Sequence, residues 1–195
     1  MHAARKLFSN SPYSAVSMSA IAEEAGVSKA NLYHHFPSKD ALFMAVLRCA
    51  CSDSAALLSQ VSGESGDVRR SLKSLALRQL HNMQADPEGA RLVLREIFDS
   101  GPERGKLLAE QILRDNFSAK VRMLRSAQNR GELKADVDPA FVLFMISAAN
   151  IMYFQSREVM KHLPDVTFAE DADRFGDLMA DFLACWLVPE RGPGP

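Results

Sequence analysis

Apolar residues recur along the chain at the three- and four-residue spacing of α-helices, without the strict alternation of β-strands. Glycine and proline fall between these periodic segments and mark their ends. The pattern predicts an all-α protein. The expected helices cover residues 1–9, 18–25, 29–35, 39–61, 68–85, 88–100, 103–130, 139–162 and 168–187. A Gly/Ser segment at residues 62–67 is the expected break between an N-terminal and a C-terminal part.

Start and stop signals divide the first fifty residues into short helices. Ser17, Ser28 and Ser38 each precede a periodic segment and are typical N-cap residues. Gly26 lies between the second and third helices, where a tight turn requires a left-handed backbone conformation. This arrangement of two short helices joined by a tight turn predicts a helix-turn-helix unit.

The helix-turn-helix unit has an apolar inner side and a polar outer side. Ile21, Ala22, Val27 and Leu32 are the expected small core between its helices. A cation, an amide and aromatic groups with polar tips are left on the outer side of the second helix, as a DNA major groove requires. These outer residues are Lys29, Ala30, Asn31, Tyr33 and His34.

Four linked motifs in this stretch resemble the tetracycline-repressor (TetR) family. They are Ile21-Ala22, residues 25–28 (AGVS), residues 32–36 (LYHHF) and residues 38–42 (SKDAL), and their spacing matches the family pattern. The resemblance covers residues 1–48. Family members usually carry an arm and a further helical turn before residues 3–8, so we expect a short first helix here. Pro12 stands where the family commonly has glycine, so the resemblance does not define the loop before Tyr13.

The resemblance implies a role for individual residues of the N-terminal helix-turn-helix part, residues 1–48, which is called the head below. Lys29, Asn31 and His34 would reach base edges from the recognition helix, which also carries Ser28. Tyr33 would contact a phosphate, and Lys39 would hold another at the start of the next helix. Ser17 could do the same at the start of its own helix. The partner is then a double-stranded DNA operator.

The resemblance also implies two domains and a homodimer. Residues 1–48 would form a three-helix, helix-turn-helix DNA-binding domain, and residues 49–195 a helical ligand-binding and dimerisation domain. In the family the last two helices pair with their copies as a four-helix bundle, and wide apolar bands on both helices are consistent with this. An intramolecular core alone is the alternative. The expected interface residues are Phe141, Met145, Phe175, Met179, Phe182 and Trp186.

The C-terminal part is rich in methionine and phenylalanine, which suit an adaptable apolar pocket for a small-molecule effector of unknown identity. Most of these side chains would nevertheless be ordinary core. The candidate effector-binding residues are His81, Phe98, Phe117, Met123, Asn150, Met152 and Tyr153.

Composition and charge exclude little but are consistent with a DNA-binding head. The 195 residues carry a net charge of -1, divided as +2 over residues 1–48 and -3 over the remainder. No catalytic constellation, metal-ligand spacing or cofactor motif is visible, so an enzyme is not expected. Three cysteines without CxxC spacing, and the absence of a signal-peptide pattern, favour a reduced cytoplasmic protein. The apolar run at residues 141–155 is too short to span a bilayer, so no membrane partner is expected.

The sequence therefore predicts a ligand-responsive transcriptional regulator, most often a repressor in this family, released from a palindromic operator by a small apolar or amphipathic effector. Two alternatives remain. One is a helical carrier of small molecules with a vestigial head. The other is a regulator controlled by oxidation of Cys49, Cys51 or Cys185, without a ligand.

Overall fold

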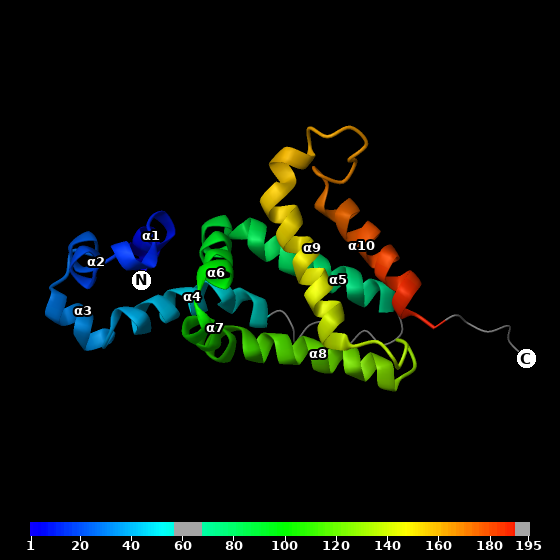
Figure 1. Ribbon diagram of the computed structural model, residues 1–195, viewed down its shortest axis with the longest axis horizontal. Coiled ribbons are helices and arrows are strands. Elements are labelled where there is room, and N and C mark those ends of the chain that lie inside the picture. Colours follow the sequence, from blue (N-terminus) through cyan, green and yellow to red (C-terminus); the bar gives the residue numbers. More distant parts are fainter. Residues whose placement is uncertain (57–67, 190–195) are drawn as a thin grey trace, which may run out of the picture. The chain divides into compact units, whose positions relative to one another are not determined.

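The structure, a computed structural model, describes residues 1–56 and 68–189, and all regular secondary structure in these ranges is helical (Figure 1). The expected Gly/Ser break at residues 62–67 and the expected helix end near residue 61 lie outside the described residues. The N-terminal elements are α1 (His2–Asn10), the 3-10 turn η1 (Tyr13–Ala15), α2 (Met18–Glu24), α3 (Lys29–His35) and α4 (Lys39–Ala56). They are followed by α5 (Val68–Ala85), α6 (Pro87–Asp99), α7 (Pro102–Leu108), the π-helical turn η3 (Ala109–Leu113), α8 (Arg114–Asn129), α9 (Pro139–Met160) and α10 (Ala172–Leu187).

The predicted caps and turn of the N-terminal helices are confirmed. The hydroxyls of Ser17 and Ser28 accept hydrogen bonds from the third backbone amide of α2 and α3, both at 3.1 Å. Ser38 does the same for α4 at 3.0 Å. Gly26 has a φ of 66°, the left-handed conformation that the tight turn was expected to need. Local side-chain chemistry therefore sets these helix boundaries.

Two later helices differ from the prediction. The last helix begins at Ala172 instead of residue 168, because Asp171 is its N-cap and accepts a hydrogen bond from the Arg174 amide at 2.9 Å. The carbonyls of Phe168 and Ala169 are bound instead by the Tyr153 hydroxyl. The predicted helix over residues 103–130 is present, but the π-helical turn η3 interrupts it between α7 and α8.

The chain divides into two compact units, and the first comprises Met1–Asp53 with Asp86–Arg114. Its apolar core includes the fully buried Phe8, Leu42 and Leu47. Helix α6 belongs to this unit because arginines join it to α1. Arg5 pairs with Asp86, and Arg95 donates to the carbonyl oxygens of Phe8 and Ser9. The division predicted at residue 48 stays a prediction.

The second unit comprises Ser54–Ala85 with Asp115–Pro195, and in its described part α5 packs against both α9 and α10 (Figure 1). Its core joins Leu72, Leu75 and Ala76 of α5 to apolar residues of α8, α9 and α10. Polar contacts add to this packing: Lys73 pairs with Asp177 at 2.6 Å, and Arg69 pairs with Asp181. The amide of buried Asn150 donates to the Ala76 carbonyl at 2.9 Å.

Helix α9 is long and apolar enough to cross a membrane, judged by its length and composition alone. One third of its most apolar stretch is buried inside the chain. The buried residues include Leu143, Ile146 and Asn150. The helix therefore has one face packed against its own chain and another that is open.

A close contact between α5 and α10 depends on a residue without a side chain. A Cβ added at Gly176 of α10 would lie 2.6 Å from Leu77 Cγ on α5. Gly176→Val is therefore expected to lower the free energy of unfolding by about 2 kcal/mol, the usual cost of overpacking a core. Urea denaturation followed by circular dichroism measures this change.

Gly105→Ala in α7 is the control for adding a Cβ at a helical glycine that has room for it. A Cβ at Gly105 would meet only Ser100 Oγ, at an ordinary 3.5 Å. Alanine favours a helix over glycine by about 1 kcal/mol, so this variant is expected to be as stable as the wild type or slightly more stable. A Gly176→Val protein with unchanged stability would contradict the close α5–α10 contact.

Candidate nucleic-acid interface

Helices α2 and α3 pack through a small apolar contact and leave most of α3 open to solvent. Ile21, Ala22 and Leu32 are buried, as predicted. Val27 was expected in the same core but is 39% exposed. It lies in the turn itself, where its amide donates to the Ala22 carbonyl at 3.0 Å. The inter-helix core is therefore smaller than the sequence indicates.

The outer side of α3 presents the side chains that were predicted to read DNA. Lys29, Asn31, Tyr33 and His34 are all exposed. The Lys29 ammonium lies 6.0 Å from the centre of the Tyr33 ring, so these two residues share one patch. The His34 and His35 rings meet edge to face, with centroids 5.4 Å apart. Cationic, amide and aromatic groups thus project from one short helix, as major-groove recognition requires.

Ser17 and Ser28 are exposed residues that act as helix N-caps. Each hydroxyl oxygen accepts a backbone hydrogen bond at the start of its helix. A serine hydroxyl can still donate its own hydrogen while it accepts. Both residues can therefore cap a helix and donate to a phosphate at the same time.

Lys39 is partly buried and makes contacts within the chain. Its ammonium donates to the carbonyl oxygens of Tyr13 and Val16, both at 2.9 Å, and lies 4.1 Å from the centre of the Tyr13 ring. An ammonium has three N–H donors, so one is left for a phosphate. The residue thus holds the loop before α2 in addition to any contact with DNA.

The structure brings further residues to this loop that the sequence did not indicate. The Tyr13 hydroxyl donates to Asp40, and the guanidinium carbon of Arg104 lies 3.9 Å from the centre of the Tyr13 ring. Arg104 in turn donates to buried Glu96 at 2.8 Å. Burial, followed by the hydrogen bond to Asp40, raises the pKa of Tyr13 above its ordinary value. No local motif indicates these partners, because they come from α4, α6 and α7.

The candidate effector-binding residues have no common location in the structure. His81, Phe98, Phe117 and Met152 are exposed, Met123 is half-buried against the second core, and Asn150 and Tyr153 are buried. Phe98 belongs to the first unit and the other six to the second. Buried Asn150 still has an unused acceptor, because its Oδ1 receives no hydrogen bond from the described residues.

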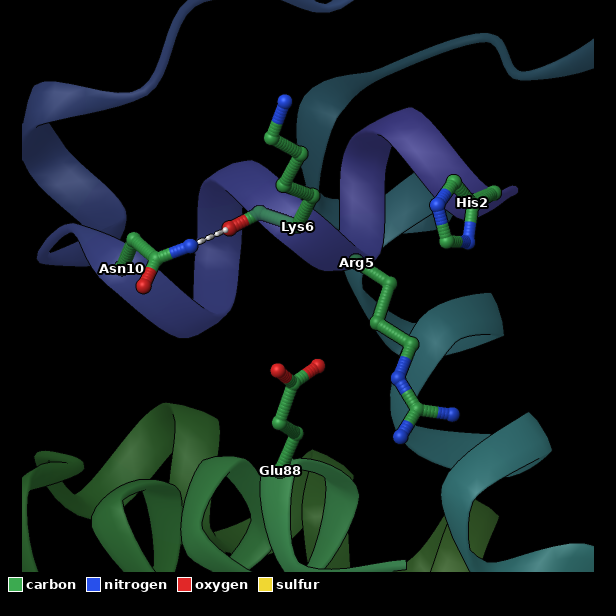
Figure 2. Close-up of a pocket in the computed structure, with 5 residues that line it drawn as sticks. All are labelled: His2, Arg5, Lys6, Asn10 and Glu88. Carbon is green, nitrogen blue, oxygen red and sulfur yellow. Dashed lines mark hydrogen bonds between the residues drawn. The ribbon is translucent and has the colours of Figure 1, made fainter.

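A cavity of about 540 Å³ lies instead between α1 and α6, within the first unit (Figure 2). The residues that line it are all polar or charged in type, and none of them is a candidate effector-binding residue. Figure 2 shows the Glu88 carboxylate of α6 pointing across the gap towards α1. The residues lining it are His2, Arg5, Lys6, Asn10 and Glu88.

The expected interface residues of α9 and α10 fall into two groups. Phe141, Met145, Phe182 and Trp186 are exposed. The other two, Phe175 and Met179, are half-buried within the chain. Phe175 packs on Tyr153 with ring centroids 4.4 Å apart, and Met179 packs against the second core. The large exposed apolar residues of α9 and α10 outside this interface prediction are Phe144, Met152, Val159 and Leu178.

Two short helices begin with serine caps, are joined by a tight turn containing glycine, and leave a polar side exposed. These features define a helix-turn-helix DNA-binding protein. Comparison with known proteins identifies the family. Residues 1–46 match the profile "Bacterial regulatory proteins, tetR family", and residues 63–172 match "Tetracyclin repressor-like, C-terminal domain". The chain belongs to the TetR family of transcriptional regulators, which are not enzymes.

Individual relatives cover most of the chain. The HTH-type transcriptional regulator RutR of Escherichia coli is 30% identical over 156 residues, which are 78% of this chain and 71% of RutR. UidR of the same organism is 27% identical over 143 residues, which are 72% of this chain and 70% of the UidR chain. Among solved structures, Salmonella enterica GusR aligns with a TM-score of 0.69 at 23% identity, over 94% and 91% of the two chains. SmeT of Stenotrophomonas maltophilia aligns with the same TM-score at 21% identity, over 100% and 92%.

The capping role of Ser28 and its predicted role in DNA binding can be separated by substitution. Ser28→Ala removes the cap of α3 and is expected to lower the free energy of unfolding by about 1 kcal/mol. Ser28→Asp keeps a capping oxygen but adds a negative charge on the DNA-reading side, so it should bind DNA more weakly and fold as well as the wild type. Thermal denaturation and fluorescence-anisotropy titration with duplex DNA measure the two effects. Equal DNA affinity for Ser28→Asp and the wild type would place Ser28 away from the phosphates.

Proposed function

We propose that this chain is a homodimeric transcriptional repressor that binds a palindromic operator in the cytoplasm of a bacterium and releases it when a small apolar or amphipathic effector binds. Base edges are read by Lys29, Asn31 and His34. Phosphates are held by Ser17, Ser28, Tyr33 and Lys39. The relative SmeT is the repressor of a multidrug efflux pump, which supports repression over activation. The observation that supports the homodimer is an exposed apolar stripe on each of the last two helices.

The stripe on α9 follows the heptad-like spacing of a helix–helix seam. Its exposed positions occur at alternating intervals of four and three residues, which places them on one side of a helix. Most of them are large and apolar, and Phe141 is 60% exposed. The opposite side of α9 is packed against α5. The positions of the α9 stripe are Phe141, Met145, Ala148, Met152, Gln155 and Val159.

Helix α10 carries a second stripe with the same spacing. Leu178, Phe182 and Cys185 are exposed at intervals of four and three, and Trp186 lies beside them with 67% of its side chain exposed. Large contiguous apolar surfaces on a soluble protein mark interaction sites. Two such stripes on consecutive helices suit a four-helix bundle with a second copy, in which each stripe meets its own equivalent.

An effector can release DNA only if it binds the released conformation more tightly than the DNA-bound one. We place its site in the second unit, most of which lies within the segment that matches the family's C-terminal domain. Asn150 is the best candidate for a polar contact, because its Oδ1 is a buried acceptor without a donor among the described residues. An effector with one hydrogen-bond donor on an apolar body fits that atom. The remaining candidates in the second unit are His81, Phe117, Met123, Met152 and Tyr153, whereas Phe98 belongs to the first unit.

Selection of duplexes from a randomised library by the purified chain tests the DNA-binding part of this proposal. The enriched sequence is expected to be a palindrome whose half-sites lie about one helical turn, or roughly 34–36 Å, apart. A carrier of small molecules with a vestigial head would enrich no sequence. A sequence without two-fold symmetry would contradict binding as a symmetric dimer.

Lys39 and the outer residues of α3 should affect DNA binding differently. Lys39→Ala is expected to weaken binding to all duplexes and to reduce the slope of log affinity against log salt by about 0.9, as expected for one lost phosphate contact. Asn31→Ala or His34→Ala should instead change the preferred base at one position of each half-site. Titrations at several salt concentrations with the selected duplex and its single-base variants measure both effects. An unchanged slope for Lys39→Ala would restrict Lys39 to holding the loop before α2.

The proposed dimer is tested by a charge in the middle of the α10 stripe. Phe182→Glu buries a carboxylate if a second copy covers this face, so the variant is expected to be monomeric and to lose most of its operator affinity. Light scattering after size-exclusion chromatography gives the mass. Leu107→Glu, which places the same charge at an exposed apolar residue of α7, is the control and should leave the mass unchanged. A dimeric Phe182→Glu protein would contradict the α10 interface.

A further inference from the structure

We propose that Arg104, a residue of α7 outside the helix-turn-helix motif, is a positioning residue for DNA binding. It holds the ring of Tyr13, and with it the loop between α1 and α2, in the conformation from which α2 begins. The proposal rests on the DNA binding described above and assigns Arg104 no contact with DNA. All the residues involved belong to the first compact unit.

The guanidinium of Arg104 lies on two aromatic rings of the head. Its central carbon is 3.9 Å from the centre of the Tyr13 ring and 5.0 Å from that of the Phe43 ring. A planar, weakly hydrated guanidinium stacks on such rings in a way that a lysine ammonium does not reproduce. Tyr13 and Phe43 also contact each other, with centroids 5.0 Å apart. Arg104 thus covers a ring pair that joins the loop to α4.

Glu96 of α6 fixes the position of that guanidinium. Its side chain is only 9% exposed, and its carboxylate accepts a hydrogen bond from Arg104 at 2.8 Å. A buried carboxylate requires a cationic or hydrogen-bonding partner, so Glu96 and Arg104 constrain each other. The pair connects α6 and α7 to the aromatic rings of the head.

The loop beneath Arg104 leads directly into α2. Besides the Tyr13 ring, it is held by Lys39, which binds the carbonyls of Tyr13 and Val16, and by Asp40, which accepts from the Tyr13 hydroxyl. Val16 immediately precedes Ser17, the N-cap of α2. A displaced Tyr13 ring would therefore shift the start of α2, where Ser17 is proposed to meet a phosphate. The effect on DNA would be geometric and not a loss of charge.

Arg104→Lys separates stacking from charge. The variant keeps a cation that can pair with Glu96 but loses the planar group on the rings. The probe is the duplex that the wild-type chain enriches most from a randomised library. We expect affinity to fall about tenfold, because residues in contact couple by that order, while the slope against log salt stays at the wild-type value.

Lys106→Ala is the matched control on the same helix. The Lys106 side chain is 73% exposed, and the contact found for it is a 4.0 Å approach to Glu110. This variant removes a positive charge without touching Tyr13, so its affinity should stay within about twofold of the wild type, in keeping with a weak exposed ion pair. A tenfold loss in Lys106→Ala as well would show that binding is sensitive to any change on α7, and would overturn the specific role of Arg104.

A double-mutant cycle with Tyr13→Leu connects the effect to the ring. In the Tyr13→Leu background, Arg104→Lys is expected to have little further effect on affinity, because the ring on which it acts is gone. Additive effects would overturn the proposal. Wild-type affinity in Arg104→Lys, together with a lower thermal midpoint, would also overturn it, because that result would show a purely structural role. A salt slope reduced by about 0.9 in Arg104→Gln, which removes the charge, would indicate a direct phosphate contact and also overturn it. A wild-type chain that enriches no duplex would overturn the proposed DNA recognition, and this proposal with it.

Discussion

Burial of the apolar sides of α2 and α3 is the interaction on which the DNA-binding surface depends. Each helix has only seven residues, too few to persist in water without tertiary packing. Ile21 and Leu32 supply that packing by joining a core with Leu42 and Leu47 of α4. The exposed side of α3 can be almost wholly polar because the opposite side is anchored in this way. Capping serines then fix the ends of helices that packing alone would leave frayed.

Electrostatic pairing around Tyr13 supplements this packing where the apolar core ends. Two cations, Lys39 and Arg104, lie within about 4 Å of one ring centre, an arrangement whose mutual repulsion needs compensation. Asp40 on the Tyr13 hydroxyl and Glu96 on Arg104 provide the opposite charges. The loop before α2 is therefore set by partners from α4, α6 and α7 more than by its own sequence. This explains why α6 and α7 fall in the same compact unit as the head.

Features with a local cause could be predicted from the sequence, and features with a distant cause could not. Ser17, Ser28 and Gly26 act on backbone groups within a few residues, so their types and spacing predict the caps and the turn. Val27 and the start of α10 were mispredicted because each depends on a competing contact. No sequence pattern indicated Arg104 or Glu96, because neither belongs to a motif and Tyr13 lies far away in the chain. The site residues on α3 were predicted through the family resemblance, which supplies what periodicity lacks.

The composition of α9 follows from having two apolar sides, one packed within the chain and the other exposed. One side is buried against α5 and includes polar groups that donate within the chain: the Asn150 amide donates to the Ala76 carbonyl, and the Tyr153 hydroxyl donates to the Ala169 carbonyl. The other side is the exposed α9 stripe. A helix that packs on α5 with one side and on a second copy with the other must be apolar nearly all round, which is also what a membrane span requires. Length and hydropathy do not distinguish the two cases, whereas the heptad-like spacing of the stripe and a matching stripe on α10 favour a protein partner. The same spacing gives the stripe a defined register, so a second copy would meet it residue against residue and not as a featureless apolar surface.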